Sequence, residues 1–227
     1  MIVWTFWEGE MPDYIRLCMD TWKERYTLLN YENLNRYTDL NTEQLKRFTL
    51  PQVADCVRVH ILRDHGGYWL DADTIMLTGE MPDTMMIGDP ASRTQSIGYL
   101  YAEKAGMDLY KEWASYQDSV LSDLNASRHW SVMGNRFTDH YVKQHKEVTI
   151  SEIEPCCPET YMITDTTERY FKYVDFYFSR TFWLGDIKKT NMLMLHNSWT
   201  PTWYKRLPKD DVLKQKCTLS HILKEVL

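Results

Sequence analysis

The sequence has no dense run of lysine and arginine. Its 26 basic residues are outnumbered by 32 acidic ones, which gives a formal net charge of −6 and a pI near 5.7. The densest basic stretches, Lys188-Lys189 and residues 143–146, are short. Because binding to a nucleic-acid backbone needs a clustered basic surface, the sequence predicts no nucleic-acid partner.

Long apolar runs are also missing. No stretch approaches the ~20 apolar residues that a membrane-spanning helix needs. Residues 2–7 are apolar, but Glu8 interrupts them before they reach the length of a signal peptide. We therefore expect no integral membrane segment. The sequence leaves open whether the chain is part of a longer, multidomain protein.

Cysteine is scarce and odd in number. Two of the five cysteines, Cys156 and Cys157, are adjacent, a spacing that does not suit pairing with each other. This pattern favours a reducing, cytosolic-type compartment over a disulfide framework. Internal repeats and low-complexity linkers are missing as well, so no feature marks a boundary and we expect one domain over residues 1–227.

Apolar periodicity predicts an α/β fold. Residues 2–7 are typical of a buried strand, 12–25 of an amphipathic helix and 26–31 of a second strand. Such an opening indicates a parallel sheet covered by helices. Further helices are expected over 51–65, 107–121, 136–143 and 213–227, and further strands over 68–70, 97–102, 148–153, 181–184 and 192–196.

A pair of aspartates follows the strand over 68–70. Asp71 and Asp73 are one residue apart, and oxygen ligands of this kind suit Mg²⁺ or Mn²⁺ bridging a diphosphate. Upstream, Asp55 and Arg58 share a helix face, a spacing also typical of a surface ion pair. Residues 196–199 follow another expected strand. Because ligands of α/β sheets bind beyond the carboxyl ends of the strands, these segments together predict a site for a divalent cation and its ligand.

These segments resemble the DXD-containing GT-A glycosyltransferases, especially the capsular polysaccharide synthesis family and its mannosyl- and galactosyltransferase relatives. The resemblance implies a GT-A fold, a Rossmann-like mixed central sheet flanked by helices. It also implies transfer of a sugar, with retention, from a nucleotide-diphosphate donor, expected to be a UDP-sugar, to a glycan or lipid-linked acceptor. The segments that carry it are Trp4-Thr5-Phe6-Trp7, Met11-Pro12, Ala54-Asp55-Cys56-Val57-Arg58, Gly66-Gly67-Tyr68-Trp69-Leu70-Asp71-Ala72-Asp73 and His196-Asn197-Ser198-Trp199.

The resemblance also implies roles for individual residues. Asp71, Asp73 and His196 would hold Mn²⁺ or Mg²⁺, although a histidine after a strand also has many structural roles. Asp55 and Arg58 would bind hydroxyls of the donor sugar, and Asp71 would reach the ribose or the metal. The remaining positions implied to bind the donor are Thr5, Phe6 and Trp7 near the base, Ala72, Asn135 near the sugar, and Ser198 and Trp199 near the phosphate.

Two other functions stay open. The stretch 70–75 is similar to the aspartate box of haloacid-dehalogenase-type phosphatases, in which Asp71 would be the nucleophile and Asp73 the acid/base. Those enzymes carry the box on the first strand, and Ile75 stands where threonine or valine is usual. The 9 tryptophans and 15 tyrosines would also suit a non-catalytic module that binds a glycan or nucleotide sugar.

The resemblance further implies where the protein works. A role in polysaccharide or glycoprotein glycan synthesis implies the cytoplasm of a bacterium or of a virus-infected host cell, with membrane association through the acceptor. The chain is short for these families. We therefore expect a reduced acceptor-binding part, or one supplied by another domain.

Overall fold

The computed structural model describes residues 2–23, 26–91, 93–125, 129–152, 165–179 and 191–227. These residues form two compact units. The first unit contains those within 1–9, 25–71 and 83–152, and the second those within 10–24, 72–82 and 153–227. The chain therefore passes from the first unit to the second between Asp71 and Ala72.

A six-stranded mixed sheet is the centre of the first unit. The strand order is β2-β1-β3-β6-β5-β7. Strand β1 is parallel to β2 and β3, β5 is parallel to β7, and β6 is antiparallel to both β3 and β5. The strands are β1 (Val3–Phe6), β2 (Tyr26–Leu29), β3 (Gly67–Leu70), β5 (Met86–Asp89), β6 (Thr94–Ala102) and β7 (Ile150–Glu152).

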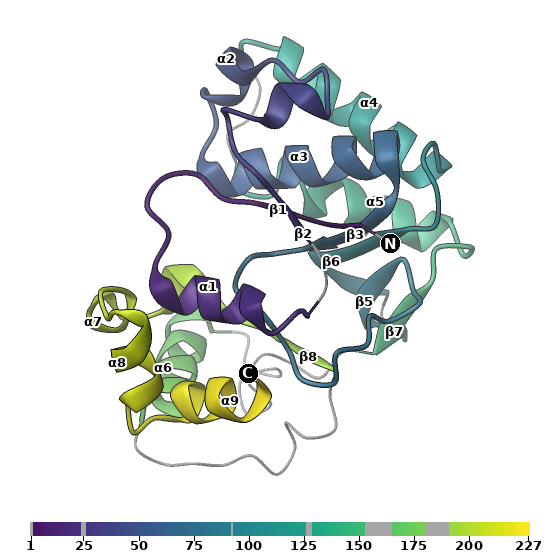
Figure 1. The fold of residues 1–227 in the computed structure, drawn as a ribbon. Helices are drawn as coiled ribbons and strands as arrows, with labels where there is room; N and C mark the ends of the chain where they lie inside the picture. Colours follow the sequence, from purple (N-terminus) through teal and green to yellow (C-terminus); the bar gives the residue numbers. More distant parts are fainter. Residues whose placement is uncertain (1, 24–25, 92, 126–128, 153–164, 180–190) are drawn as a thin grey trace. The chain divides into compact units, whose positions relative to one another are not determined.

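Three helices cover one face of this sheet (Figure 1). Helices α3 (Leu50–His65) and α5 (Asn135–Gln144) contact the sheet, and α4 (Asp108–Ser122) packs against both helices. Two short elements, η1 (Leu34–Arg36) and α2 (Thr42–Leu45), lie between β2 and α3 in the chain. The core between sheet and helices includes Trp69, Leu100, Val57 and Trp113. The expected α/β class, a Rossmann-like mixed sheet flanked by helices, is confirmed.

The turn from α3 into β3 depends on two glycines. Helix α3 begins with a capping box between Thr49 and Gln52 and ends at Gly66, whose φ is +67°. At Gly67 φ is +94°, and a Cβ atom there would lie 2.5 Å from the carbonyl oxygen of Ile2. Only glycine fits this conformation and this approach. The pair therefore lets the chain leave the helix and enter the sheet directly beside β1.

The second unit combines a two-stranded sheet with helices. Strand β4 (Thr74–Met76) pairs antiparallel with β8 (Met192–Met194). Helix α1 (Asp13–Asp20) packs against β4, α7 (Thr202–Lys205) and α8 (Lys209–Lys214), while α9 (Thr218–Val226) packs against α8 and α6 (Thr166–Phe178). The short helix η4 (Asn197–Trp199) follows β8 and contacts α6.

Several predicted elements differ from the observed ones. The helix expected over 12–25 ends at Asp20, and the one expected over 213–227 is two helices, α8 and α9, because residues 215–217 are extended. Strand β5 and helix α6 were not expected. The strand over 181–184 and the turn at Cys156-Cys157 lie outside the described residues. The expectation of one GT-A domain over 1–227 stays a prediction.

Membrane-spanning helices were not expected. Within the part of the chain that the structure describes, no helix has both the length and the apolar character needed to cross a bilayer.

His60 makes the stability of the fold sensitive to acid. Its side chain is 1% exposed in α3, and burial, together with the charge of Arg63, lowers its pKa to about 4. An unfolded chain protonates this histidine at a higher pH, near 6.5. The stability contributed by neutral His60 is therefore fully present above about pH 6.5 and is lost as the pH falls toward about 4.

We expect His60→Leu to remove this loss. Between about pH 7.5 and pH 5, the fall in unfolding free energy should be smaller in the variant by about 2 kcal/mol, measured by urea denaturation. His140→Gln, at an exposed position of α5, is the matched control and should keep the wild-type profile. An unchanged profile in His60→Leu would show that the buried histidine does not set the acid sensitivity.

Candidate active site

Arg58 is the centre of a charged cluster in the first unit. Its Nη2 lies 2.9 Å from Oδ1 of Asp55 and 3.1 Å from Oδ1 of Asp71. The guanidinium also donates from Nε to the carbonyl of Ala54 at 3.2 Å, and from Nη1 to the carbonyl of Ile97. Arg58 is only 3% exposed. The alternative interpretation, an ion pair exposed on the helix surface, is therefore wrong, and the donor-binding role stays a prediction.

Trp69 holds Asp71 from the strand side. The indole Nε1 donates to Oδ1 of Asp71 at 2.9 Å, and the ring lies under the Arg58 guanidinium with 5.2 Å to the ring centre. The backbone N–H of Asp71 donates to Gly98 at 2.8 Å. The side chain of Asp71 nevertheless stays 36% exposed, against 14% for Asp55. Asp71 is therefore the member of the cluster that meets solvent.

The guanidinium of Arg58 forms ion pairs with both carboxylates of this cluster. Burial raises the pKa of Asp55 to about 7, with a further increase from the negative charge of Asp71, and Arg58 offsets only part of this. Near neutral pH, Asp55 is therefore protonated in a substantial fraction of molecules. A protonated carboxyl group can donate a hydrogen bond as well as accept one.

The loop before α5 lies against Asp55. Gln117 of α4 donates to the carbonyls of Met133 at 2.6 Å and Asp55 at 2.9 Å. A Cβ atom on Gly134 would lie 2.7 Å from Oδ2 of Asp55 and 2.5 Å from Cδ1 of Ile97. Asn135, predicted to line the sugar site, follows directly and is half-buried. The structure thus places this loop beside the Asp55 carboxylate, within the first unit.

We expect Gly134→Ala to disturb this contact. The added methyl group must displace Ile97 or the Asp55 carboxylate, at a cost of about 1–3 kcal/mol of unfolding free energy. In an Asp55→Ala background the carboxylate is gone, so the same substitution should cost less. Urea denaturation of the four proteins of this double-mutant cycle measures the coupling. Equal costs in both backgrounds would show that the loop does not press on Asp55.

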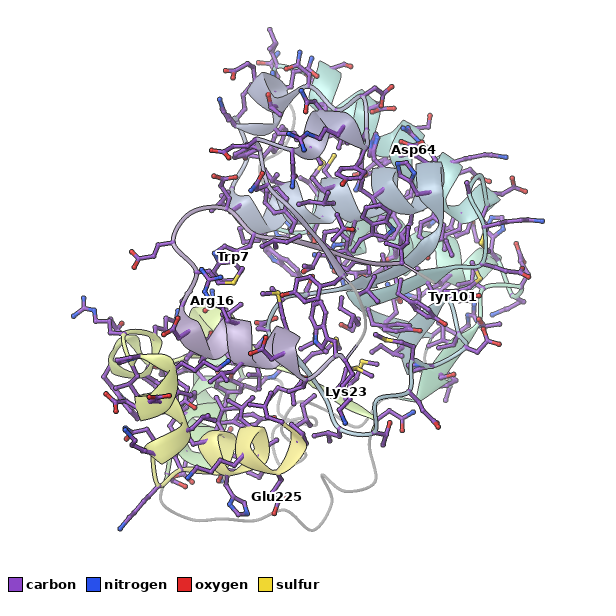
Figure 2. The ribbon with its side chains drawn as sticks, in the orientation of Figure 1. Trp7, Arg16, Lys23, Asp64, Tyr101 and Glu225 are labelled. Carbon is purple, nitrogen blue, oxygen red and sulfur yellow. The ribbon has the colours of Figure 1, made fainter. Side chains whose placement is uncertain are left out.

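The predicted base site lies at the carboxyl end of β1. Thr5 is fully buried and Phe6 is 7% exposed, and the Phe6 ring packs in the core with 5.8 Å between its centre and that of Tyr31. Trp7, just after β1, is half-exposed (Figure 2). Its backbone N–H donates to the carbonyl oxygen of Leu29 at 3.0 Å. Of these three residues, Trp7 is the most exposed.

Asp73 and His196 belong to the second unit. Beyond the β4–β8 pairing, the N–H of Leu195 donates to the carbonyl of Asp73 at 3.1 Å. The N–H of Asn197 then donates to Oδ2 of the Asp73 carboxylate at 2.8 Å, and Asn197 accepts at Oδ1 from the Tyr14 hydroxyl at 2.5 Å. The backbone at His196-Asn197 is therefore held directly beside the Asp73 carboxylate.

Aromatic rings surround His196. The centre of the His196 ring lies 4.3 Å from that of Trp199 and 5.6 Å from that of Tyr173. Burial, and next the positive charge of Arg169, lower the pKa of His196 to about 4. The imidazole is therefore neutral at neutral pH, the form that can bind a metal ion. Ser198 is exposed and Trp199 half-buried on η4.

Residues 1–187 match the sequence profile of the capsular polysaccharide synthesis protein family. The chain belongs to this family. Membership indicates a role in polysaccharide biosynthesis, and the expected kinship to capsule-synthesis proteins is confirmed. No curated protein matches the chain.

The family match divides the predicted site residues. Thr5 to Trp7, Asp55, Arg58, the Asp71-Ala72-Asp73 triplet and Asn135 lie inside it, whereas His196, Ser198 and Trp199 lie beyond its end at residue 187. For this capsular-synthesis chain, the resemblance at 196–199 thus rests on the sequence and geometry of that segment alone. The roles of all these residues stay predictions.

The ligand atoms that Asp73 and His196 offer suit a hard divalent cation that binds together with its substrate. In neither unit do the described residues bring three histidine, cysteine or acidic side chains together as a ligand group. Mg²⁺ is commonly bound through one or two carboxylates plus substrate phosphates, so fewer protein ligands are enough. Asp73 with a neutral His196 therefore fits such a cation. A metal role for Asp71 stays a prediction, because its Oδ1 already accepts from Trp69 and faces Arg58.

The structure also adds residues that the sequence analysis missed. Trp69 and Gln117 hold the first cluster, and Tyr14 and Tyr173 hold the turn after β8. Gln117 is fully buried. A polar residue within the apolar stripe of α4 could have indicated from the sequence that this side chain makes buried hydrogen bonds. The aspartate triplet follows β3, the third strand in the chain, which is unlike the first-strand box of the phosphatases.

Proposed function

We propose that this protein is a metal-dependent glycosyltransferase with a GT-A fold. It moves a sugar, with retention, from a UDP-sugar to a glycan or lipid-linked acceptor in capsule-type polysaccharide synthesis. The observation that carries the proposal is the placement of a half-exposed Asp73 carboxylate against the His196-Asn197 backbone. Membership of the capsular polysaccharide synthesis family supports the same conclusion.

Asp73 and His196 are the residues that would hold the cation, Mn²⁺ or Mg²⁺. When bound, such a cation stabilises the negative charge that develops on the departing diphosphate. The Asn197 N–H orients the Asp73 carboxylate, and low basicity keeps the His196 imidazole neutral. Trp199, whose ring centre lies 4.3 Å from that of His196, would donate its indole N–H toward a phosphate oxygen.

The first cluster would bind the donor sugar. Asp55 and the more exposed Asp71 offer carboxyl oxygens to sugar or ribose hydroxyls. Arg58 is buried and its donors point at Asp55, Asp71, Ala54 and Ile97. We therefore assign Arg58 a positioning role, since it holds both carboxyl groups in place. Asn135 and the half-exposed Trp7 would contact the sugar and the base.

Calorimetry of UDP binding tests the proposal. We expect UDP to bind in the presence of Mn²⁺ and to lose affinity when a chelator removes the metal. If UDP does not bind, GDP is the next ligand to measure. Failure of both nucleotides would overturn the glycosyltransferase proposal.

A further inference from the structure

Two positive side chains of the second unit lie near residues of the 196–199 turn or its partner Asp73, and neither forms an ion pair with a described residue. Arg169 lies on α6 and Lys205 at the end of α7. Among the described residues, neither side chain forms an ion pair or a hydrogen bond through its charged group. Some cations of this unit are paired, such as Lys209, which lies 2.8 Å from Asp20, and others, such as Lys172 and Arg206, are exposed to water. Arg169 and Lys205 are instead half-buried, so their lack of an ion pair among the described residues needs an explanation.

Arg169 is held beside His196 by its own helix. One turn further along α6, the Tyr173 hydroxyl accepts the N–H of His196 at 3.1 Å, and the ring of Tyr170 approaches that of Trp199 with 6.4 Å between centres. Arg169 is close enough for its charge to depress the pKa of His196. Its Nε is buried and, within the described part of the chain, has no hydrogen-bond partner. A buried donor left unpaired costs about 1–3 kcal/mol.

Lys205 is close enough to Asp73 for the carboxylate charge to act on it. Two residues separate η4 from helix α7, and the Tyr204 ring of α7 packs on Tyr14, with 5.7 Å between centres. Lys205 is half-buried. Burial lowers its pKa, and the opposing effect of the Asp73 charge does not cancel this. The ammonium group is therefore partly removed from water, and among the described residues it forms no ion pair.

We propose that Arg169 and Lys205 bind the diphosphate group of the donor. This inference rests on the proposed function, because the same turn carries His196 and contacts Asp73. A diphosphate has enough oxygens to contact a cation held by Asp73 and His196 and, at the same time, both side chains. Arginine and lysine are the side chains best suited to phosphate oxygens.

The pair would act on the departing group. Negative charge on the diphosphate grows as the bond to the sugar breaks, and fixed positive charges in a partly buried site stabilise it. A phosphate oxygen would also satisfy the buried Nε of Arg169. Neither residue transfers a proton or forms a bond in this proposal. They add positive charge to that of the metal.

Charge-removing variants test the pair. We expect Lys205→Met and Arg169→Met each to weaken binding of UDP and of inorganic pyrophosphate, measured with Mg²⁺ by equilibrium dialysis, by about ten- to a hundredfold. Lys205→Arg keeps the charge and should stay within about threefold of wild type. The matched controls are Arg206→Met, at the exposed residue that follows α7, and Lys172→Met, at an exposed position of α6.

The outcomes separate this inference from the proposed function. If the wild type binds UDP and the methionine variants bind it as tightly as the controls do, the inference is overturned while the proposed function stands. If Lys205→Arg loses as much affinity as Lys205→Met, packing and not charge matters, and the inference is again overturned. Pyrophosphate binding that depends on both side chains, without UDP binding, supports the anion site and overturns the nucleotide donor. Binding of neither ligand overturns both.

Discussion

Asp73→Asn is expected to abolish sugar transfer while the protein stays folded. The substitution removes the negative charge that would hold the cation, and loss of stabilisation of the departing diphosphate should lower turnover on the order of a thousandfold or more. Asparagine is chosen over alanine because its side-chain oxygen can still accept the N–H of Asn197, which Oδ2 of Asp73 accepts at 2.8 Å. Release of UDP from a panel of UDP-sugars with Mn²⁺ measures the effect.

The control separates chemistry from folding. Asp175→Asn removes a charge from an exposed position of α6 in the same unit and should keep wild-type turnover. Thermal unfolding of Asp73→Asn should change little. Turnover that persists in this variant would exclude Asp73 as a metal ligand. A large fall in its melting temperature would instead make the carboxylate a structural group.

Arg58→Met is expected to produce the largest loss of stability of any single substitution considered for this fold. It removes the cation that pairs with two carboxylates, Asp55 and Asp71, at a site where Arg58 is 3% exposed. Breaking a buried ion pair by removing one partner costs about 3–5 kcal/mol, because a charge remains buried without compensation. Urea denaturation near neutral pH measures the loss.

Two further variants test the reason for this loss. Arg58→Met combined with Asp55→Asn should recover part of the stability, because one uncompensated charge is removed. Arg63→Met, at a position one to two turns along the same helix where the side chain is 22% exposed, should cost no more than about 1 kcal/mol. Equal losses in Arg58→Met and Arg63→Met would contradict the importance of burial.

The pH dependence of the Arg58→Met loss has a definite sign. The pKa of Asp55 is already raised to about 7, and Arg58 lowers it, so removing the guanidinium raises this pKa further. The extra destabilisation from Asp55 is therefore present above about pH 7, where the wild-type carboxyl group is ionised, and it shrinks as the pH falls below about 7. Repeating the denaturation at about pH 5.5 should give a smaller difference between variant and wild type than at about pH 8.

Some features of the site could be predicted from the sequence because they depend on residues that are close together in the chain. The three-residue spacing of Asp55 and Arg58 places both on one helix face, and the structure shows the ion pair. The glycine pair before β3 was a reliable sign of a sharp turn, since only glycine adopts the positive φ of residues 66 and 67. The aspartates after β3 were likewise located correctly at the end of a strand.

Other features depend on residues far apart in the chain. Asp71 joins Arg58 because β3 lies beside β1 under α3, and this contact turns an apparent surface pair into a buried cluster in which the pKa of Asp55 is raised to about 7. Phe6 was equally compatible with a base site and with the core, and packing places it in the core. Strand β5 was missed because its short run has no clear periodicity without its partners β6 and β7.

By itself, the sequence determined the α/β class, the strand end that carries the aspartates, and the kinship to capsule-synthesis proteins, because periodicity, turn residues and local motifs are properties of short segments. Only the tertiary structure decided which charges are buried, which carboxylate meets solvent, and which cations form no ion pair within the described part of the chain. Burial and electrostatic pairing are set by groups that folding brings together from distant parts of the chain. Arg169 and Lys205 stand 36 residues apart in the sequence, and only the folded second unit reveals both beside one turn.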